Sequence, residues 1–244
     1  MLNYHLTISS KKRKNNIINE ILNQPINNNG VVNIHRLNPN NIGDYYCAPH
    51  QFFKKLEHKA LDISDLRSRK KSVTDNFKNE ILQKSLIIGG GGLFNIKHFN
   101  LQMEMFESLS KKGKKIVIWG AGHNEIDYQK YLKTNQYWID TSNFGLTGTR
   151  DYANNQKDFW IPCVSCLDSS FDKEYTIKHD IGLLFNHKSI KDNDLKNKFK
   201  HFPISSNTTD MNEMIEFIGS SDTLVTNVLG YSNEKKGYCN TYYI

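Results

Sequence analysis

Two clusters of glycine, each following a short apolar run, constrain the fold of this chain more than any other feature. The first is S-L-I-I-G-G-G-G-L-F at 85–94, and the second is K-I-V-I-W-G-A-G-H-N at 115–124. A helix-like stretch lies between them, with Leu101, Met105 and Leu109 at four-residue spacing. The order strand, glycine loop, helix, strand, glycine loop predicts a parallel α/β sheet with a ligand cleft at the carboxyl ends of its strands.

Glycine is expected at such turns because a Cβ would block the approach of the backbone to a ligand or to the next helix. Backbone N–H groups left free there can hold an anion. Neither cluster fits G-x-G-x-x-G or G-x-x-x-x-G-K-[ST], so the sequence supports neither a dinucleotide site nor a P-loop. The chain also lacks a G-x-S-x-G nucleophile elbow and an H-E-x-x-H metal motif.

The apolar periodicity predicts further elements along the chain. Strands are expected at 31–36, 116–119, 144–147, 159–164, 181–185 and 223–226. Helices are expected at 11–23, from about Tyr45 through Leu56, at 74–83 with Thr74 as N-cap, at 127–134 and at 211–218. These elements predict a helical extension at 1–30, a Rossmann-like domain at 31–167, a linker at 168–179 and a partial Rossmann-like domain at 180–244 with an aberrant tail from about 228.

The net charge is +7, with a pI near 9.0, and short basic runs lie at 11–14, 67–71 and 111–115. Such runs are typical of solvated faces and helix ends. They would also attract a phosphorylated metabolite, a nucleic acid or an anionic membrane surface. No run interleaves basic residues with aromatic ones, so nucleic acid is not an expected partner.

The opening of the chain lacks the long apolar core of a signal peptide, and no segment reaches the length of a transmembrane helix. A cytoplasmic protein with reduced thiols is therefore expected. Cys163 and Cys166 are spaced C-x-x-C, but a single pair is a poor metal site, and no metal is expected. A redox role would favour a pair at the N-terminus of a helix, so structural cysteines are the main interpretation.

Polar residues follow several of the predicted strands. Asn41 and Asp44 end the loop after the first strand, His123 and Asn124 end the second glycine loop, and Arg150 follows the next strand. These side chains could converge on one cleft. Arg150 suits a carboxylate or phosphate, and Asp44 could act as a general base. Each also has a structural reading: Asp44 as a helix cap, His123 as a hydrogen-bond donor at a helix start, and Arg150 in a surface ion pair.

Several of these segments, taken in order, resemble the motifs of the polysaccharide pyruvyl transferase family. They are N-I-G-D at 41–44, I-I-G-G-G-G-L-F at 87–94, W-G-A-G-H-N at 119–124, G-T-R-D-Y at 148–152 and W-I-P-C-V-S-C-L at 160–167. The resemblance spans residues 31 to about 227 and is carried by order and spacing, because no single motif is specific.

The resemblance implies an α/β fold of the GT-B type, with two Rossmann-like domains built on parallel sheets. It implies transfer of a pyruvyl group from phosphoenolpyruvate to hydroxyls of a cell-surface glycan, in exopolysaccharide or capsule biosynthesis, with no cofactor. The acceptor would be a glycan or lipid-linked glycan, which allows peripheral association with the inner face of the membrane. Asp44 and Arg150 would be catalytic, and the cleft would be lined by Asn41, Gly43, Gly90, Gly91, Gly92, Gly120, Gly122, His123, Asn124 and Asn227.

The sequence departs from this family after Asn227. The family carries a Thr-Asn-Ser-Tyr-His-Gly type motif there, whereas this chain continues V-L-G-Y-S-N-E-K-K-G-Y-C-N-T-Y-Y-I. Reading the codons of the tail in a shifted frame permits F-W-A-T-L-M-K-K-R-V-I-V-I-P, so a frameshift near Asn227 is one hypothesis. On it, the second domain is truncated, the histidine is missing, and activity is expected to be weak or absent. The alternatives are a GT-B glycosyltransferase using a nucleotide sugar and a non-catalytic remnant that binds a glycan or a partner.

Overall fold

The computed structural model describes residues 2–38, 40–123, 136–151, 158–227 and 240–242 of the 244-residue chain. The chain divides into two compact units, which are considered one at a time. The first unit comprises residues 1–37 and 47–165, and the second comprises 38–46 and 166–244. The second unit thus includes a short segment, 38–46, that the sequence pattern places with the first strand.

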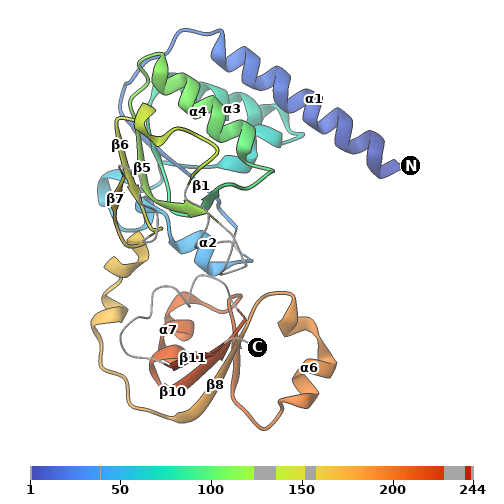
Figure 1. The fold of residues 1–244 in the computed structure, drawn as a ribbon, viewed down its shortest axis with the longest axis vertical. Helices are drawn as coiled ribbons and strands as arrows, with labels where there is room; N and C mark the ends of the chain where they lie inside the picture. Colours follow the sequence, from blue (N-terminus) through green and yellow to red (C-terminus); the bar gives the residue numbers. More distant parts are fainter. Residues whose placement is uncertain (1, 39, 124–135, 152–157, 228–239, 243–244) are drawn as a thin grey trace. The chain divides into compact units, whose positions relative to one another are not determined.

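The first unit is built on a parallel sheet that contains seven strands in the described part of the chain (Figure 1). Its order is β2-β1-β3-β5-β6-β7, and β4 also pairs with β5. The strands are β1 (Val31–His35), β2 (Ala60–Asp62), β3 (Ser85–Ile88), β4 (Gly91–Phe94), β5 (Ile116–His123), β6 (Leu146–Thr149) and β7 (Phe159–Trp160). This α/β architecture is compatible with a Rossmann-like fold, as predicted.

Three helices pack with this sheet and complete the core of the first unit: α1 (Leu2–Leu22), α3 (Lys71–Gln83) and α4 (Asn100–Lys111) (Figure 1). The predicted stripe on α4 is confirmed as core, since Met105 and Leu109 are almost fully buried. Ile21 of α1 and Phe77 of α3 lie in the same apolar cluster as strand residue Ile118. The apolar periodicity of each helix therefore produces one continuous core.

Much of the two glycine clusters is strand, so the loop prediction holds only for Gly89 and Gly90, which connect β3 to β4. Gly91 and Gly92 begin β4, where they pair in parallel register with Ala121 and Gly122 of β5. Strand β5 runs on through the second cluster as far as His123. Helix α4 starts well after β4, so the first cluster does not open a helix. The N–H groups of Gly89 and Gly90, which were expected to cradle an anion, donate to the carbonyls of Ile34 at 3.1 Å and Cys47 at 2.8 Å.

Two predicted helices also differ from the structure. In place of one helix from Tyr45 through Leu56, there is a short helix α2 (Ile42–Tyr46), followed by the 3-10 turns η1 (Pro49–Gln51) and η2 (Lys54–Leu56). Pro49 fits the start of a turn and interrupts a longer helix, because it has no N–H to donate. Thr74 is not an N-cap, because α3 begins at Lys71; the Thr74 hydroxyl donates to the carbonyl of Ser68 at 3.3 Å. The predicted helix at 127–134 lies outside the described residues.

Short 3-10 turns connect the remaining elements of both units. They are η3 (Ile63–Arg67), η4 (Thr141–Asn143), η5 (Val164–Leu167), η6 (Ser169–Asp172) and η7 (Ser189–Lys191). Asp62, Asp140 and Asp168 precede three of these turns, and each carboxylate accepts the N–H two residues on. Aspartate at these positions therefore explains why the chain turns there.

The second unit has its own parallel sheet, of order β11-β10-β8-β9 in the described residues (Figure 1). Its strands are β8 (His179–Phe185), β9 (Ile204–Ser206), β10 (Ser221–Thr226) and β11 (Asn240–Tyr242), and its longer helices are α6 (Asn193–Lys198) and α7 (Met211–Gly219). Met214 and Ile215 of α7 form a small core with Leu184 and Leu224, and Ile42 of α2 packs against it. That contact explains why the segment 38–46 belongs to this unit.

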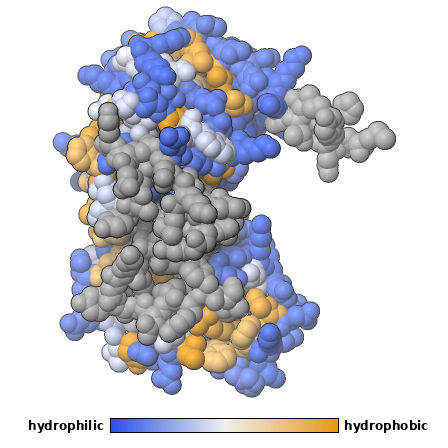
Figure 2. All heavy atoms as spheres, in the orientation of Figure 1, coloured by the Kyte–Doolittle hydropathy of each residue, from blue (hydrophilic) through white to orange (hydrophobic). Residues whose placement is uncertain are grey.

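Most of the described surface on the face shown in Figure 2 is hydrophilic, with apolar patches between charged groups. Lys11, Lys12 and Lys115 of the basic runs are exposed, in agreement with a solvated face. Two lysines depart from that expectation, since Lys14 is 7% and Lys114 is 2% exposed. None of the helices in the described ranges combines the length and apolarity needed to cross a bilayer.

Candidate functional site

Three of the predicted site residues come together at the carboxyl ends of neighbouring strands β5 and β6. A Cβ added at Gly122 would lie 2.8 Å from Cγ and 3.0 Å from Nε of Arg150, so the arginine side chain passes directly over this glycine. His123 follows in β5, and its side chain is 6% exposed. The Arg150 N–H donates to the carbonyl of Ala121 at 3.2 Å, which fixes the start of the arginine against the sheet.

A buried carboxylate, that of Asp151, stabilises this strand end. Its Oδ2 accepts the His123 N–H at 2.9 Å and the Tyr137 hydroxyl at 2.8 Å. The Tyr137 hydroxyl is also 2.8 Å from Oγ1 of Thr149, which accepts the Asp151 N–H at 2.9 Å. Asp151 is 6% exposed, so protein donors take the place of the water that would otherwise hydrate its carboxylate. The network holds the backbone around Arg150 and His123 in one arrangement.

The other predicted glycines of the first unit contact protein backbone. A Cβ at Gly90 would lie 2.5 Å from the carbonyl oxygen of Cys47 and 3.2 Å from that of Gly120. The Gly90 N–H donates to the same Cys47 oxygen at 2.8 Å. Gly120 has a φ of +65°, which favours glycine, and a Cβ there would lie 3.8 Å from Cα of Cys163. These two glycines therefore allow the segments at 47 and 163 to pack on the strand ends.

This packing fills the place where the sheet order predicts a ligand. The chain runs from β1 to β2 on one side and returns to β3 on the other, so the topological switch point lies between β1 and β3. Asn33 of β1 donates from Nδ2 to the carbonyls of Ile87 at 2.9 Å and Gly89 at 3.2 Å, and its Oδ1 accepts the His50 N–H at 3.2 Å. Residues of the chain itself thus occupy this crevice, and burial lowers the pKa of His50 there.

A thiol cluster adjoins the same strand ends. The Cys163 sulfur accepts the Ser165 hydroxyl at 3.1 Å, and the Cys47 sulfur lies 3.8 Å from Nε2 of His35. A hydrogen bond from Cys47 lowers the pKa of Cys163 to about 6; burial opposes this, and Ser165 and the positive charge of Arg150 add to it. The predicted C-x-x-C partner is elsewhere, because Cys166 is exposed and belongs to the second unit.

The predicted residues Asn41 and Asp44 lie in the second unit, where they form the first turn of α2. Asn41 Nδ2 donates to Oδ2 of Asp44 at 3.0 Å, and Nδ2 of Asn207 donates to Oδ1 of Asn41 at 3.0 Å. The Ile42 N–H donates to the Asn207 carbonyl at 3.0 Å, which ties the start of the helix that contains Gly43 to the loop after β9. These contacts agree with the structural reading of Asp44, as a residue of the first turn.

Asn227 ends β10 at the switch point of the second sheet, between β8 and β10. Its Oδ1 accepts the Asn186 N–H at 2.8 Å, and its Nδ2 donates to the Ser189 hydroxyl at 2.9 Å. The side chain thus orders the loop that follows β8. Asn124, the remaining predicted residue, lies outside the described ranges.

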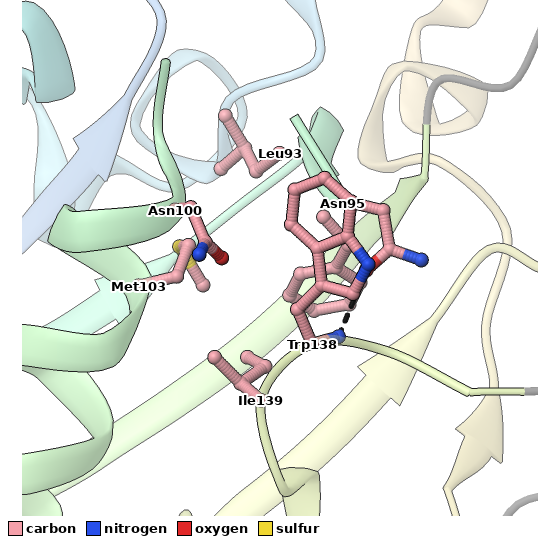
Figure 3. A pocket seen from close by; sticks show the side chains of 7 residues that line it. Leu93, Asn95, Asn100, Met103, Trp138 and Ile139 are labelled. Carbon is pink, nitrogen blue, oxygen red and sulfur yellow. Dashed lines mark hydrogen bonds between the residues drawn. The ribbon is translucent and has the colours of Figure 1, made fainter. Parts of the chain in front are cut away.

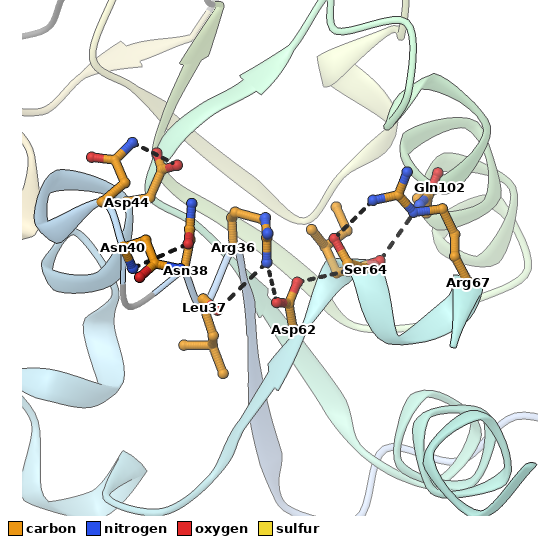
Figure 4. A network of polar contacts seen from close by, with 11 residues as sticks. Arg36, Leu37, Asn38, Asn40, Asp44, Asp62, Ser64, Arg67 and Gln102 are labelled. Carbon is orange, nitrogen blue, oxygen red and sulfur yellow. Dashed lines mark hydrogen bonds and ion pairs between the residues drawn. The ribbon is translucent and has the colours of Figure 1, made fainter. Parts of the chain in front are cut away.

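A polar network that the sequence reasoning missed follows β1 and β2 (Figure 4). Arg36 forms an ion pair with Oδ2 of Asp62, whose Oδ1 accepts the Ser64 N–H at 2.7 Å. Arg67 donates to the Ser64 hydroxyl at 3.2 Å. The charge of Arg36 is therefore balanced within the protein.

A small depression of about 170 Å³ in the first unit is lined by Leu93, Phe94, Asn95, Asn100, Met103, Trp138 and Ile139 (Figure 3). The Trp138 N–H donates to Oδ1 of Asn95 at 2.9 Å. The lining of the depression holds apolar and amide side chains and no ionisable one, so the depression offers no positive charge to bind an anionic donor substrate. In the described part of the chain, no group of three or more His, Cys, Asp or Glu side chains is arranged to hold a metal ion.

One sequence pattern could have located the buried polar residues of β1 that the sequence analysis did not single out. Asn33 and His35 alternate with Val32 and Ile34 in β1, and all four are almost fully buried. Polar residues at every second position of a central strand indicate a buried polar face, because alternate side chains point to the same side of the sheet. The partners of these side chains, by contrast, have no local signature. Comparisons with models of protein families, with curated proteins and with solved structures returned no match.

Proposed function

We propose that the chain is a polysaccharide pyruvyl transferase-like enzyme, which binds phosphoenolpyruvate and transfers its pyruvyl group to hydroxyls of a sugar in a surface polysaccharide. The two units would act as the two halves of a GT-B arrangement. The order and spacing of the motifs at 41–44, 87–94, 119–124, 148–152 and 160–167 support this assignment. The donor is a cytoplasmic metabolite, so the reaction belongs on the cytoplasmic side, with a glycan or lipid-linked glycan as acceptor.

The observation that carries the proposal is the placement of Arg150 and His123 at the adjoining ends of β5 and β6. Phosphoenolpyruvate carries a carboxylate and a phosphate ester on the same carbon, C2. A guanidinium binds two oxygens of either group at once, and a nearby imidazole can donate to the other. Arg150 is half-buried, and both its Cγ and its Nε lie beside Gly122.

In the proposed reaction, the oxygens of two sugar hydroxyls form bonds to C2 of the donor and the C2–O bond to the phosphate breaks. C3 takes up one of the two hydroxyl protons, and the other leaves with the phosphate. The guanidinium of Arg150 would stabilise the negative charge that develops on the departing phosphate. Arg150 would hold the donor through the reaction, and His123 is proposed to exchange a proton.

Calorimetric titration of the full chain with phosphoenolpyruvate tests the donor site. We expect binding, weakened about 10- to 100-fold in Arg150→Ala, because a charge-assisted hydrogen bond contributes roughly 1.5–3 kcal/mol. Arg150→Lys should recover part of the affinity, since it keeps the charge and loses the planar fork. Arg69→Ala is the matched control, because Arg69 is an exposed arginine of the same unit.

The same titration separates the alternatives. Tighter binding of a UDP- or CDP-sugar that competes with phosphoenolpyruvate would replace the proposal with a nucleotide-sugar glycosyltransferase. Binding of phosphoenolpyruvate without turnover on any glycan acceptor would favour a non-catalytic binding protein. If phosphoenolpyruvate does not bind, or binds equally well to Arg150→Ala with a native circular dichroism spectrum, the proposed donor site is wrong.

A further inference from the structure

Cys47 and Cys163 are far apart in the sequence and are brought into direct contact in the first unit. The Cys47 thiol donates a hydrogen bond to the Cys163 sulfur. Both side chains are 4% exposed, and both are free thiols. Neither the C-x-x-C spacing nor the proposed pyruvyl transfer accounts for a pair of buried thiols at this place.

The backbone on both sides of the pair is fixed by glycine. Gly90 approaches the Cys47 carbonyl, to which it donates at 2.8 Å, and Gly120 lies against Cα of Cys163. Any Cβ at Gly90 would overlap the Cys47 carbonyl oxygen, at 2.5 Å. The segments that carry the two cysteines are therefore packed against the ends of the sheet strands.

Two further groups favour chemistry at these sulfurs. The Ser165 hydroxyl donates to Cys163 at 3.1 Å, which favours its thiolate form. Nε2 of His35 lies 3.8 Å from the Cys47 sulfur and can receive its proton. One thiol is thus prepared to attack as a thiolate, and the other is prepared to lose a proton.

We propose that Cys47 and Cys163 are a disulfide-forming site, at which a small peroxide oxidises the two contacting thiols to an intramolecular disulfide. The proposal is independent of the proposed transferase activity.

The reaction proceeds in two steps. The Cys163 thiolate attacks one oxygen of hydrogen peroxide, the O–O bond breaks, and a sulfenic acid forms with release of hydroxide. The Cys47 sulfur then attacks the sulfenic sulfur, and the S–S bond forms as water leaves. His35 takes the proton of Cys47, and the hydroxide is protonated in turn. The two thiols lose two electrons in total, and one peroxide is reduced to two waters.

The experiment treats the native, fully reduced chain with hydrogen peroxide, then alkylates it and maps its peptides without reduction. We expect a single cross-linked peptide pair containing Cys47 and Cys163, and its disappearance after reduction. The melting temperature should rise by roughly 5–15 °C on oxidation, because the bond closes a loop of roughly a hundred residues. A bulky thiol reagent should modify exposed Cys166 first, whereas the small peroxide reaches the buried pair.

Cys47→Ser should stop the reaction at the Cys163 sulfenic acid, which a dimedone probe traps, and Cys166→Ser should form the disulfide as the wild type does. Circular dichroism shows whether each variant is folded, and the mapping of the wild-type chain decides the question even if Cys47→Ser is not. A Cys163–Cys166 bond, a bond to Cys239, or a Cys47–Cys163 pair that stays reduced while Cys166 is oxidised would each overturn the proposal.

Discussion

The carboxylate of Asp151 accepts a hydrogen bond from the backbone N–H of His123 at 2.9 Å, across the ends of two neighbouring strands. The residue after Arg150 thus holds the backbone of the residue after Gly122. The carboxylate is buried, so its energetic role is large and can be measured.

Asp151→Asn should lower the free energy of unfolding by about 1–3 kcal/mol, because a neutral amide replaces a buried charged acceptor of two hydrogen bonds. Urea unfolding followed by circular dichroism measures the change. Asp172→Asn is the control, since Asp172 is an exposed aspartate, and it should shift the curve by less than about 0.5 kcal/mol. Equal curves for the two variants would contradict this role of Asp151.

Gly122→Ala should destabilise the first unit by about 1–3 kcal/mol, because the added Cβ overpacks a closed site. The Cβ would lie 2.5 Å from Oδ1 of Asp151 and 2.8 Å from Cγ of Arg150. Gly145→Ala is a matched control, since the nearest atom to its Cβ, the Ile116 carbonyl oxygen, is 3.3 Å away. A thermal melt in which both variants match the wild type would show that the arginine stem relaxes at no cost.

Asn33→Ala should lower the free energy of unfolding by about 2–4 kcal/mol, because the Ile87 and Gly89 carbonyls lose the amide donor that they share. Asn33 is fully buried, so water cannot replace the lost donor. Asn28→Ala removes a comparable amide whose hydrogen bond to the Gly113 carbonyl is exposed, so its free energy of unfolding is expected to fall by less. The measurement is guanidinium unfolding, and an Asn33→Ala midpoint above that of Asn28→Ala would refute the assignment.

Lys114→Met should remove a pH-dependent part of the stability. The Lys114 Nζ donates to the carbonyls of Asn27 and Leu82, and burial lowers its pKa to about 8 from 10.5. Between these pH values the unfolded chain binds more protons than the native chain, so this group makes stability rise with pH from about 8 to about 10.5. Below pH 8 lysine is charged in both states, and its contribution is constant.

Free energies of unfolding of the wild type and Lys114→Met at pH 7, 8, 9 and 10 test the sign. The lowest pH lies below the range in which Lys114 affects the pH dependence, and the other three lie within it. The wild type should gain stability relative to the variant as pH rises. Lys115→Met, at the exposed neighbouring position, should keep the wild-type slope. If the wild type instead loses stability relative to Lys114→Met as the pH rises, the pKa of Lys114 is not lowered in the native state.

The sequence predicted the elements that depend on local apolar runs. Ile87 and Ile88 lie in a strand, and so do Ile116 and Ile118, because alternating or continuous apolar residues need a sheet to bury them. The strand residues of the glycine clusters were misassigned as loops because glycine is uncommon within strands. The pairing of Gly92 with Gly122 shows that these glycines belong to two neighbouring strands, β4 and β5.

The site was predictable in its position and not in its contacts. The rule that ligand groups follow parallel strands located Arg150 and His123, which the structure brings to neighbouring strand ends. Asp151, Tyr137 and the Cys47–Cys163 pair depend on segments distant in sequence, and no local pattern marks such contacts. For the same reason the sequence did not show that Asn41 is bound by Asn207 within the second unit.

The bond between Asn207 and Asn41 has a consequence for synthesis, because it joins residues 166 positions apart. The segment 38–46 leaves the ribosome early, yet its packing partners in the second unit are made only after nearly all of the first unit. Domains generally fold as units in the order of their synthesis, so this short helix lacks its partners in the second unit while the first sheet assembles. The second unit can therefore fold only after the whole chain between its two segments has been made. Until then, Ile42 lacks the apolar cluster of the second unit against which it packs.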